Sequence, residues 1–187
     1  MIKYMENIIL ETKTKSGKTV SFRYPTTNDA EILKNYINKI SAEKSFILLQ
    51  GEQQTLKEEQ DWLDKKIESI SKNECIFIMA FIENKLIASS EITLKSLARK
   101  HIGGFGITVA KEYRGEGIGK ILMDLVIQES IKNIKDLKII ELEVFANNPI
   151  AQNLYKKIGF VEFGCLPGGL KRRDEFVDEI FMYKKVK

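Results

Sequence analysis

The sequence predicts one α+β domain, a mixed α/β arrangement with a single twisted sheet and helices on both faces. Two observations indicate this class. Short runs of strand-like residues joined by tight turns dominate the middle of the chain, and after residue 109 they give way to strands that alternate with helical patterns. The 187 residues also contain no internal repeat and no Gly/Ser/Pro-rich linker, so one hydrophobic core is expected.

Turn and capping residues predict where the strands and helices of the first half of the chain begin and end. Ser16-Gly17 marks a hairpin turn, residues 26–29 offer side chains that can cap a helix, and Asn84-Lys85 joins two strands of a meander. Apolar residues at helical spacing predict a second helix before this meander. The expected elements are strands 8–10 and 19–24, a helix that carries Leu33, Tyr36 and Ile40, a helix over 55–71, and strands 76–83, 86–94 and 102–109.

The second half alternates strands and helices, which is the pattern of parallel pairing. Asn148 is suited to cap a helix, Pro149 to occupy its first position, and Gly159 to end it in a left-handed conformation. We divide the chain into an N-terminal hairpin extension, residues 1–18, and a domain, residues 19–187, with six to seven strands. The expected elements are helix 117–133, strand 139–145, helix 148–158, and strands 160–165 and 177–183.

The composition excludes several classes of function. A net charge of +4 is too small to indicate nucleic acid binding. Two cysteines and one histidine supply neither a disulfide framework nor a metal site. The longest apolar run, residues 75–82, is much shorter than the roughly 18 residues of a membrane span, and no secretory signal is visible. We therefore expect a cytoplasmic protein that binds neither nucleic acid nor membrane and holds no metal.

The most informative segment is a glycine-rich turn between strand 102–109 and the following helix. Gly115, Gly117 and Gly119 lie close together at the start of that helix. The first N–H groups of a helix have no intrahelical acceptor and carry the positive end of the helix dipole, and glycine allows close approach of a bulky anion. We therefore expect the turn to bind phosphate. A turn that only reverses the chain is the alternative.

Two common phosphate motifs do not fit this turn. A P-loop requires glycine where Arg114 stands and serine or threonine where Ile121 stands. A dinucleotide-binding fingerprint requires a third glycine where Lys120 stands, and it belongs in a βαβ unit rather than after a meander. The pattern that remains is Arg-x-x-Gly-x-Gly, with the charges of Arg114 and Lys120 beside the turn.

A second pattern, Asn-x-x-Ala-x-x-Leu-Tyr-x-x-x-Gly-Phe, covers residues 148–160. Helix capping and a buried apolar stripe would explain it if it stood alone. Together with residues 114–119, however, it resembles the GCN5-related N-acetyltransferase (GNAT) superfamily. The tail from Lys171 to Met182, which includes residues 178–182, resembles the ribosomal-protein and amino-acid N-acetyltransferase branch of that superfamily. The resemblance implies that strand 102–109 splays away from its parallel neighbour, strand 139–145, in the middle of the sheet.

The resemblance also implies acetyl-CoA, which becomes coenzyme A after the reaction, as a co-substrate between these two strands. Its thioester carbonyl would face the Val109 N–H, and its diphosphate would bind the glycine-rich turn. The residues implied to bind it are Ile107, Thr108, Val109, Arg114, Gly115, Glu116, Gly117, Ile118, Gly119, Lys120 and Asn148.

Two catalytic residues are implied in the same way. Tyr155 occupies the position of the general acid near the departing thiolate, and Glu143 that of a general base that removes a proton from the amine. Glu141, Glu91 or a chain of waters are alternatives for the base, because Gly103 and the glycines after it replace a carboxylate that many relatives carry.

The function that the resemblance implies is acetyl transfer to a primary amine of a small molecule, by direct attack on the thioester and without an acyl-enzyme. The alternatives are an enzyme that acts on the N-terminal amine of a protein, and a CoA-binding module without catalysis. A homodimer is also implied, since relatives are often dimers. Among the other reactive side chains, we expect Cys165 in the core and His101 at the surface.

Overall fold

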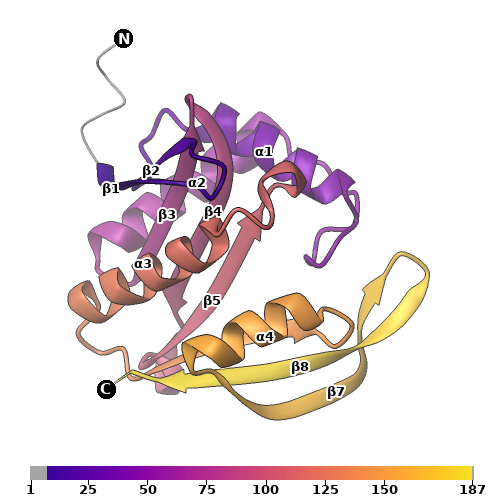
Figure 1. Cartoon of the computed structure of the whole chain (residues 1–187). Helices are drawn as coiled ribbons and strands as arrows, with labels where there is room; N and C mark the ends of the chain where they lie inside the picture. Colours follow the sequence, from indigo (N-terminus) through magenta and orange to yellow (C-terminus); the bar gives the residue numbers. More distant parts are fainter. Residues whose placement is uncertain (1–7, 187) are drawn as a thin grey trace.

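In the computed structural model, which describes residues 8–186, eight strands form one sheet in the order β1-β2-β3-β4-β5-β6-β8-β7 (Figure 1). Neighbouring strands are antiparallel except β5 and β6, which are parallel. The expected α+β class with one mixed sheet is therefore confirmed. The elements are β1 (Ile8–Lys13), β2 (Thr19–Arg23), α1 (Ala30–Ala42), α2 (Leu56–Ser71), β3 (Cys75–Ile82), β4 (Lys85–Leu94), β5 (Ile102–Val109), α3 (Ile118–Asn133), β6 (Ile139–Phe145), α4 (Pro149–Ile158), β7 (Val161–Arg172) and β8 (Glu175–Lys185).

The sheet has more strands than the expected six to seven, because β1 pairs with β2 and forms an edge of the same sheet. The proposed extension, residues 1–18, contributes this edge strand, and its residues 1–7 lie outside the described residues. The strands at the other edge are longer than expected. Register shifts in β7 accommodate a Pro-Gly-Gly segment, residues 167–169, of a kind that usually ends a strand.

Two pairs of helices cover the two faces of the sheet (Figure 1). The helices α3 and α4 pack on one face, and α1 and α2 pack on the other. Strand β3 lies between both layers and is buried at all eight positions. The edge strand β7 is largely exposed, so Cys165 is exposed and the expectation that it lies in the core is wrong. His101 is exposed, as expected. None of the described helices is long and apolar enough to cross a membrane.

The ends of α4 follow the predicted capping, whereas the start of α1 does not. The side-chain oxygen of Asn148 accepts a hydrogen bond of 3.2 Å from the Ala151 N–H, and Gly159 ends the helix with a φ of 95°. Asp29 precedes α1, but its side chain makes no capping hydrogen bond. The reason is that its carboxylate is bound elsewhere.

Asp29 forms a buried ion pair with Arg23 at the end of β2. Arg23 donates two hydrogen bonds of 2.8 and 2.7 Å to the carboxylate, and the Thr26 N–H donates a third of 2.6 Å. The side chains of Arg23 and Asp29 are only 6% and 2% exposed. Burial alone would raise the pKa of Asp29, but the hydrogen bonds from Arg23 and Thr26 outweigh burial and hold that pKa below its usual range.

We expect the substitution Asp29→Asn to lower the free energy of unfolding by roughly 3–5 kcal/mol, because it leaves the Arg23 cation buried without its counter-charge. Urea unfolding followed by circular dichroism at neutral pH measures this loss. The exposed Asp174 in the turn between β7 and β8 offers a matched control, and Asp174→Asn should change the free energy by less than about 0.5 kcal/mol. Equal stabilities of the two variants would contradict the role of the pair.

The same ion pair predicts a loss of stability in acid. Because the folded-state pKa of Asp29 lies below the unfolded-state value of about 4, its carboxylate stabilises the fold fully above that pH. This contribution is lost as the pH falls through the folded-state pKa. The urea midpoint of the wild type should therefore fall more steeply below about pH 4 than that of Asp29→Asn. Parallel pH curves for the two proteins would refute the assignment.

Candidate functional site

Strands β5 and β6 pair only at their beginnings. Residues 102–104 of β5 pair with residues 139–141 of β6, whereas β5 stays paired with β4 as far as Val109. After Gly104 the two parallel strands diverge, so the second half of β5 has a strand neighbour on one edge only. The expected splayed pair is therefore present in the middle of the sheet.

This divergence leaves backbone groups of β5 without strand partners. Ala110 donates its N–H to the Ile87 carbonyl of the β4 side at 2.9 Å. Because backbone groups alternate between the two edges of a strand, the N–H and C=O groups of Ile107 and Val109 point away from β4. The Val109 carbonyl accepts a hydrogen bond of 2.9 Å from the Arg114 side chain, and within residues 8–186 the Val109 N–H has no acceptor. It is a free donor on the open edge.

The glycine-rich turn presents a second set of free donors. Gly115 and Gly117 have φ values of 83° and 85°, in the left-handed region that glycine adopts without strain. The N–H groups of residues 115–119 have no acceptor in the described part of the chain, whereas those of Arg114 and Lys120 donate to carbonyls within the turn. Free N–H groups at the start of a helix are the arrangement that binds anions.

The space beside this turn is open, and the turn is held in place. A Cβ added at Gly115 would meet no atom within 4 Å, and one at Gly117 would meet only the Lys15 side chain at 3.9 Å. The N–H groups of Lys15 and Ser16 bind the carbonyl and the carboxylate of Glu116 at 3.3 and 2.9 Å. The residues present therefore fit a bulky anion such as a diphosphate, and the donors need little rearrangement to bind it.

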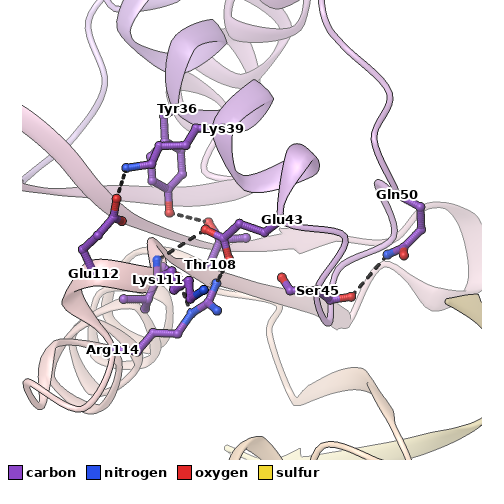
Figure 2. A network of polar contacts seen from close by, with 10 residues as sticks. Tyr36, Lys39, Glu43, Ser45, Gln50, Thr108, Lys111, Glu112 and Arg114 are labelled. Atoms are coloured by element: carbon purple, nitrogen blue, oxygen red, sulfur yellow. Dashed lines mark hydrogen bonds and ion pairs between the residues drawn. The ribbon is translucent and has the colours of Figure 1, made fainter. Parts of the chain in front are cut away.

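Helix α1 holds the other side of this segment (Figure 2). Its last turn leads to Glu43, whose carboxylate accepts a hydrogen bond of 3.3 Å from the Lys111 N–H and pairs with the Arg114 guanidinium. One turn earlier, Lys39 pairs with Glu112. These contacts fix the position of α1 relative to the end of β5.

Both cations beside the turn are paired with carboxylates in this structure. Arg114 pairs with Glu43, and the Lys120 ammonium lies 2.7 Å from an oxygen of Asp124 on the same helix. Exposed pairs of this kind contribute little stability, so a ligand phosphate can replace the carboxylates at small cost. Asn148 uses its side-chain oxygen to cap α4. The backbone N–H groups are therefore the donors already aligned for an anion.

The side chain of Thr108 points to the opposite face of the sheet from the turn and α3. Its hydroxyl forms a hydrogen bond of 2.9 Å with the Tyr36 hydroxyl (Figure 2). A second hydrogen bond, of 3.1 Å, joins it to the Ser89 hydroxyl. Its backbone groups face β4, because they alternate with those of Val109. Thr108 thus positions α1 over the sheet, while Ile107 and Val109 supply the open edge.

Tyr155 on α4 lies on the face of the sheet that carries α3. Its ring packs against Phe105 and Phe160, with centroid separations of 6.1 Å to each. Tyr155 is 8% exposed, and burial raises the pKa of its phenol to about 12. Its hydroxyl makes no hydrogen bond among residues 8–186, and it is not one of the sealed polar atoms without a partner. At neutral pH this phenol is protonated and can donate a proton.

The carboxylates of β6 lie on the opposite face from Tyr155. Successive β6 side chains alternate between faces, and the even-numbered ones pack toward α3 and α4. Glu141 is bound by the side chains of Lys95 and Arg99. The side chain of Glu143 is exposed and forms no ion pair within the described residues. The Tyr155 phenol and the Glu143 carboxylate thus lie on opposite faces of the sheet.

Two further carboxylates lie on that face. Glu91 on β4 is paired with Lys66. Glu179 on β8 lies diagonally across the β6–β8 pairing from Glu143 and is 9% exposed. Burial, and next the charge of Glu143, raise the pKa of Glu179. Sequence reasoning missed Glu179 because its position beside Glu143 depends on the β6–β8 register, which no local pattern fixes.

A pocket of about 370 Å³ lies between the sheet and the helices α1 and α2. It extends to the part of β5 that has the open edge. Tyr36 of α1 and Glu59 and Trp62 of α2 contribute to its lining. Amphipathic helices give the same pattern whether they cover a core or a pocket. The lining residues are Leu33, Tyr36, Ile37, Leu49, Gln54, Glu59, Trp62, Phe77, Ser89, Ser90, Glu91, Gly106, Ile107 and Thr108.

Comparison with known proteins agrees with this architecture. The model of the acetyltransferase (GNAT) family matches residues 39–160. The L-amino acid N-acetyltransferase AaaT of Escherichia coli (strain K12) is 31% identical over 106 residues, which are 56% of this chain and 65% of that protein. The chain thus spans slightly less than two thirds of this curated relative.

Solved structures show the same fold. The acetyltransferase of the GNAT family from Streptococcus pneumoniae superposes with a TM-score of 0.82 at 29% identity, covering 90% of this chain and 99% of that one. The ribosomal-protein-alanine N-acetyltransferase from Brucella melitensis gives a TM-score of 0.77 at 20% identity, covering 88% and 99%.

Proposed function

Because the chain belongs to the acetyltransferase (GNAT) family, we propose that it is an acetyl-CoA-dependent N-acetyltransferase whose acceptor is a primary amine of a small molecule. The observation that carries this proposal is the continuity between the open edge of β5 and the free N–H groups of residues 115–119. Acetyl-CoA has amides along its pantetheine arm and a diphosphate beyond them, so one extended molecule can satisfy both sets of donors.

In the proposed complex, the backbone of Ile107 pairs with a pantetheine amide, and residues 115–119 bind the diphosphate. The Val109 N–H donates to the thioester oxygen, where negative charge develops as the amine attacks. The new C–N bond forms at the carbonyl carbon, and the C–S bond breaks with its electron pair on sulfur. Tyr155 donates to that sulfur as general acid, and burial keeps its phenol protonated until then.

The acceptor ammonium must lose a proton before it attacks. We place this step on the face of the sheet opposite Tyr155. Glu143 is our candidate for the base, since it is exposed and unpaired among the described residues. Glu179 lies beside it, and burial together with the charge of Glu143 raises the pKa of Glu179. Glu141 and Glu91 are bound by lysine or arginine side chains, so their oxygens are less available to accept a proton from the acceptor.

The pocket beside β5 supports a small acceptor. Its volume of about 370 Å³ and its mainly apolar lining are typical of sites that enclose a small molecule. A protein N-terminal amine, the alternative acceptor, would need a wider cleft for the polypeptide that follows it. A CoA-binding module without catalysis would not need a pocket beside the thioester.

The proposal predicts thiol release from acetyl-CoA in the presence of a small amine. A screen of amino acids, polyamines, aminoglycosides and short peptides, read by thiol detection, tests it. We expect turnover with a small amine and less than a tenth of that rate with peptides. Turnover with peptides alone would establish the protein acceptor. CoA binding without any thiol release across the screen would favour the non-catalytic module.

Replacement of Tyr155 by phenylalanine tests the general acid. We expect Tyr155→Phe to lower kcat roughly 100-fold, the usual contribution of a positioned acid, because the ring contacts remain but the proton donor is gone. CoA affinity, measured by calorimetry, should stay near the wild-type value. Tyr183→Phe on β8 is a control with the same chemical change. If kcat of Tyr155→Phe matched that of this control, Tyr155 would not be the acid.

Replacement of Gly117 tests the diphosphate site. We expect Gly117→Val to weaken CoA binding at least 100-fold, because a branched side chain is strained at a φ of 85° and projects into the open space of the turn. At Gly119 a Cβ would meet Val109 at an ordinary 3.7 Å, so Gly119→Ala should keep CoA binding. Calorimetry measures the CoA affinity of both variants after circular dichroism has shown that they are folded. Tight CoA binding by Gly117→Val would contradict the site.

A further inference from the structure

The pocket under α1 and α2 contains one carboxylate that has no partner. Glu59 makes no hydrogen bond or ion pair through its side chain anywhere in residues 8–186, although the residue is only 7% exposed and lines the pocket. The other acidic residue of the lining, Glu91, is neutralised by Lys66. Glu59 is therefore the carboxylate in the pocket whose charge the described residues leave unbalanced.

Burying a charged carboxylate without a partner is energetically unfavourable. A ligand that offsets this unfavourable energy must therefore be a cation. Burial raises the pKa of Glu59, since the apolar lining disfavours the charged form. A bound cation reverses this preference by supplying the missing counter-charge and hydrogen bonds. The neighbouring lining residues Leu33, Ile37 and Trp62 offer apolar and aromatic surface, which suits a methylene chain.

Glu59 lies away from the reacting end of the pocket. It is on α2, which packs on β3, and Trp62 one turn later meets Phe77 of β3 edge-to-face at 5.3 Å. The open edge where the thioester would lie belongs to β5. Two strand spacings separate β3 from β5, or about 10 Å. We therefore assign the group held by Glu59 and the amine that attacks at β5 to different ends of the pocket.

We propose that the acceptor carries two amino groups joined by an apolar chain, one presented to the thioester at the edge of β5 and the other bound by Glu59. This inference rests on the proposed function, because it takes the pocket as the acceptor site. Cadaverine and spermidine belong to the class, since each joins primary amines through methylene segments. The distal ammonium pairs with the Glu59 carboxylate, and the chain packs along Ile37 and Trp62.

Trp62 allows the inference to be tested without the reaction. It is the only tryptophan of the chain and lines the pocket beside Glu59, so its fluorescence reports on ligands there. We would titrate the protein, alone and with excess coenzyme A, with cadaverine, with spermidine and with aminopentanol. Aminopentanol keeps the length and one amine of cadaverine but replaces the second ammonium by a hydroxyl group.

We expect the wild type to bind cadaverine or spermidine at least tenfold more tightly than aminopentanol. Glu59→Gln, which keeps the shape but removes the charge, should abolish this preference by weakening diamine binding at least tenfold. Asp61→Asn removes one charge from an exposed position of the same helix and should leave all affinities unchanged. Equal wild-type affinities for the diamines and aminopentanol would overturn the inference, and so would a preference that survives in Glu59→Gln.

The outcomes separate this inference from the proposed function. If the diamine preference is present but no thiol is released from acetyl-CoA, the acetyltransferase proposal fails and Glu59 remains a diamine-binding group. If thiol is released with another amine and the preference is absent, the enzyme stands and the inference fails. The wild-type comparison needs no variant, so it decides even if Glu59→Gln is poorly folded.

Discussion

The structure depends on a constraint of backbone hydrogen bonding: the N–H and C=O groups of a strand inside a sheet must have partners. After Gly104, β5 has lost β6 and keeps only β4, so the outward groups of Ile107 and Val109 face a gap in the middle of the sheet. A sheet interior is a costly place for unpaired groups. An extended ligand that pairs with this edge supplies the missing partners, and the free N–H groups of residues 115–119 continue the same row of donors.

Contacts between distant parts of the chain hold this arrangement ready for a ligand. Glu43 at the end of α1 binds Lys111 and Arg114 on one side of the turn, and the hairpin residue Ser16 binds Glu116 on the other. The donors are therefore oriented before anything binds, which lowers the cost of binding. On the face that carries α1 and α2 the carboxylates divide into two groups. Glu141 and Glu91 are neutralised by lysine or arginine, whereas Glu143 and Glu59 form no ion pair among residues 8–186.

Local signals in the sequence predicted the parts of the fold that local physics decides. Sequence patterns predicted the strand that ends at Val109, the glycine-rich start of α3 and the two ends of α4. This is possible because hydrophobic periodicity, glycine conformation and helix capping act within a few residues. Contacts between residues far apart in the chain could not be predicted from the sequence. The partner that draws Asp29 away from capping α1, the register that sets Glu179 beside Glu143, and the bulged length of β7 depend on residues far apart in the chain. For the same reason, no local pattern indicates that Glu59 faces a pocket rather than solvent.

A crystal structure with coenzyme A tests the central claim most directly. The account predicts that the diphosphate accepts hydrogen bonds from the N–H groups of residues 115–119, and that the pantetheine arm runs along the open edge of β5 with its sulfur beside the Tyr155 hydroxyl. A diphosphate bound elsewhere would contradict the account. So would a structure in which β5 and β6 close together beyond Gly104 and leave no edge for the ligand.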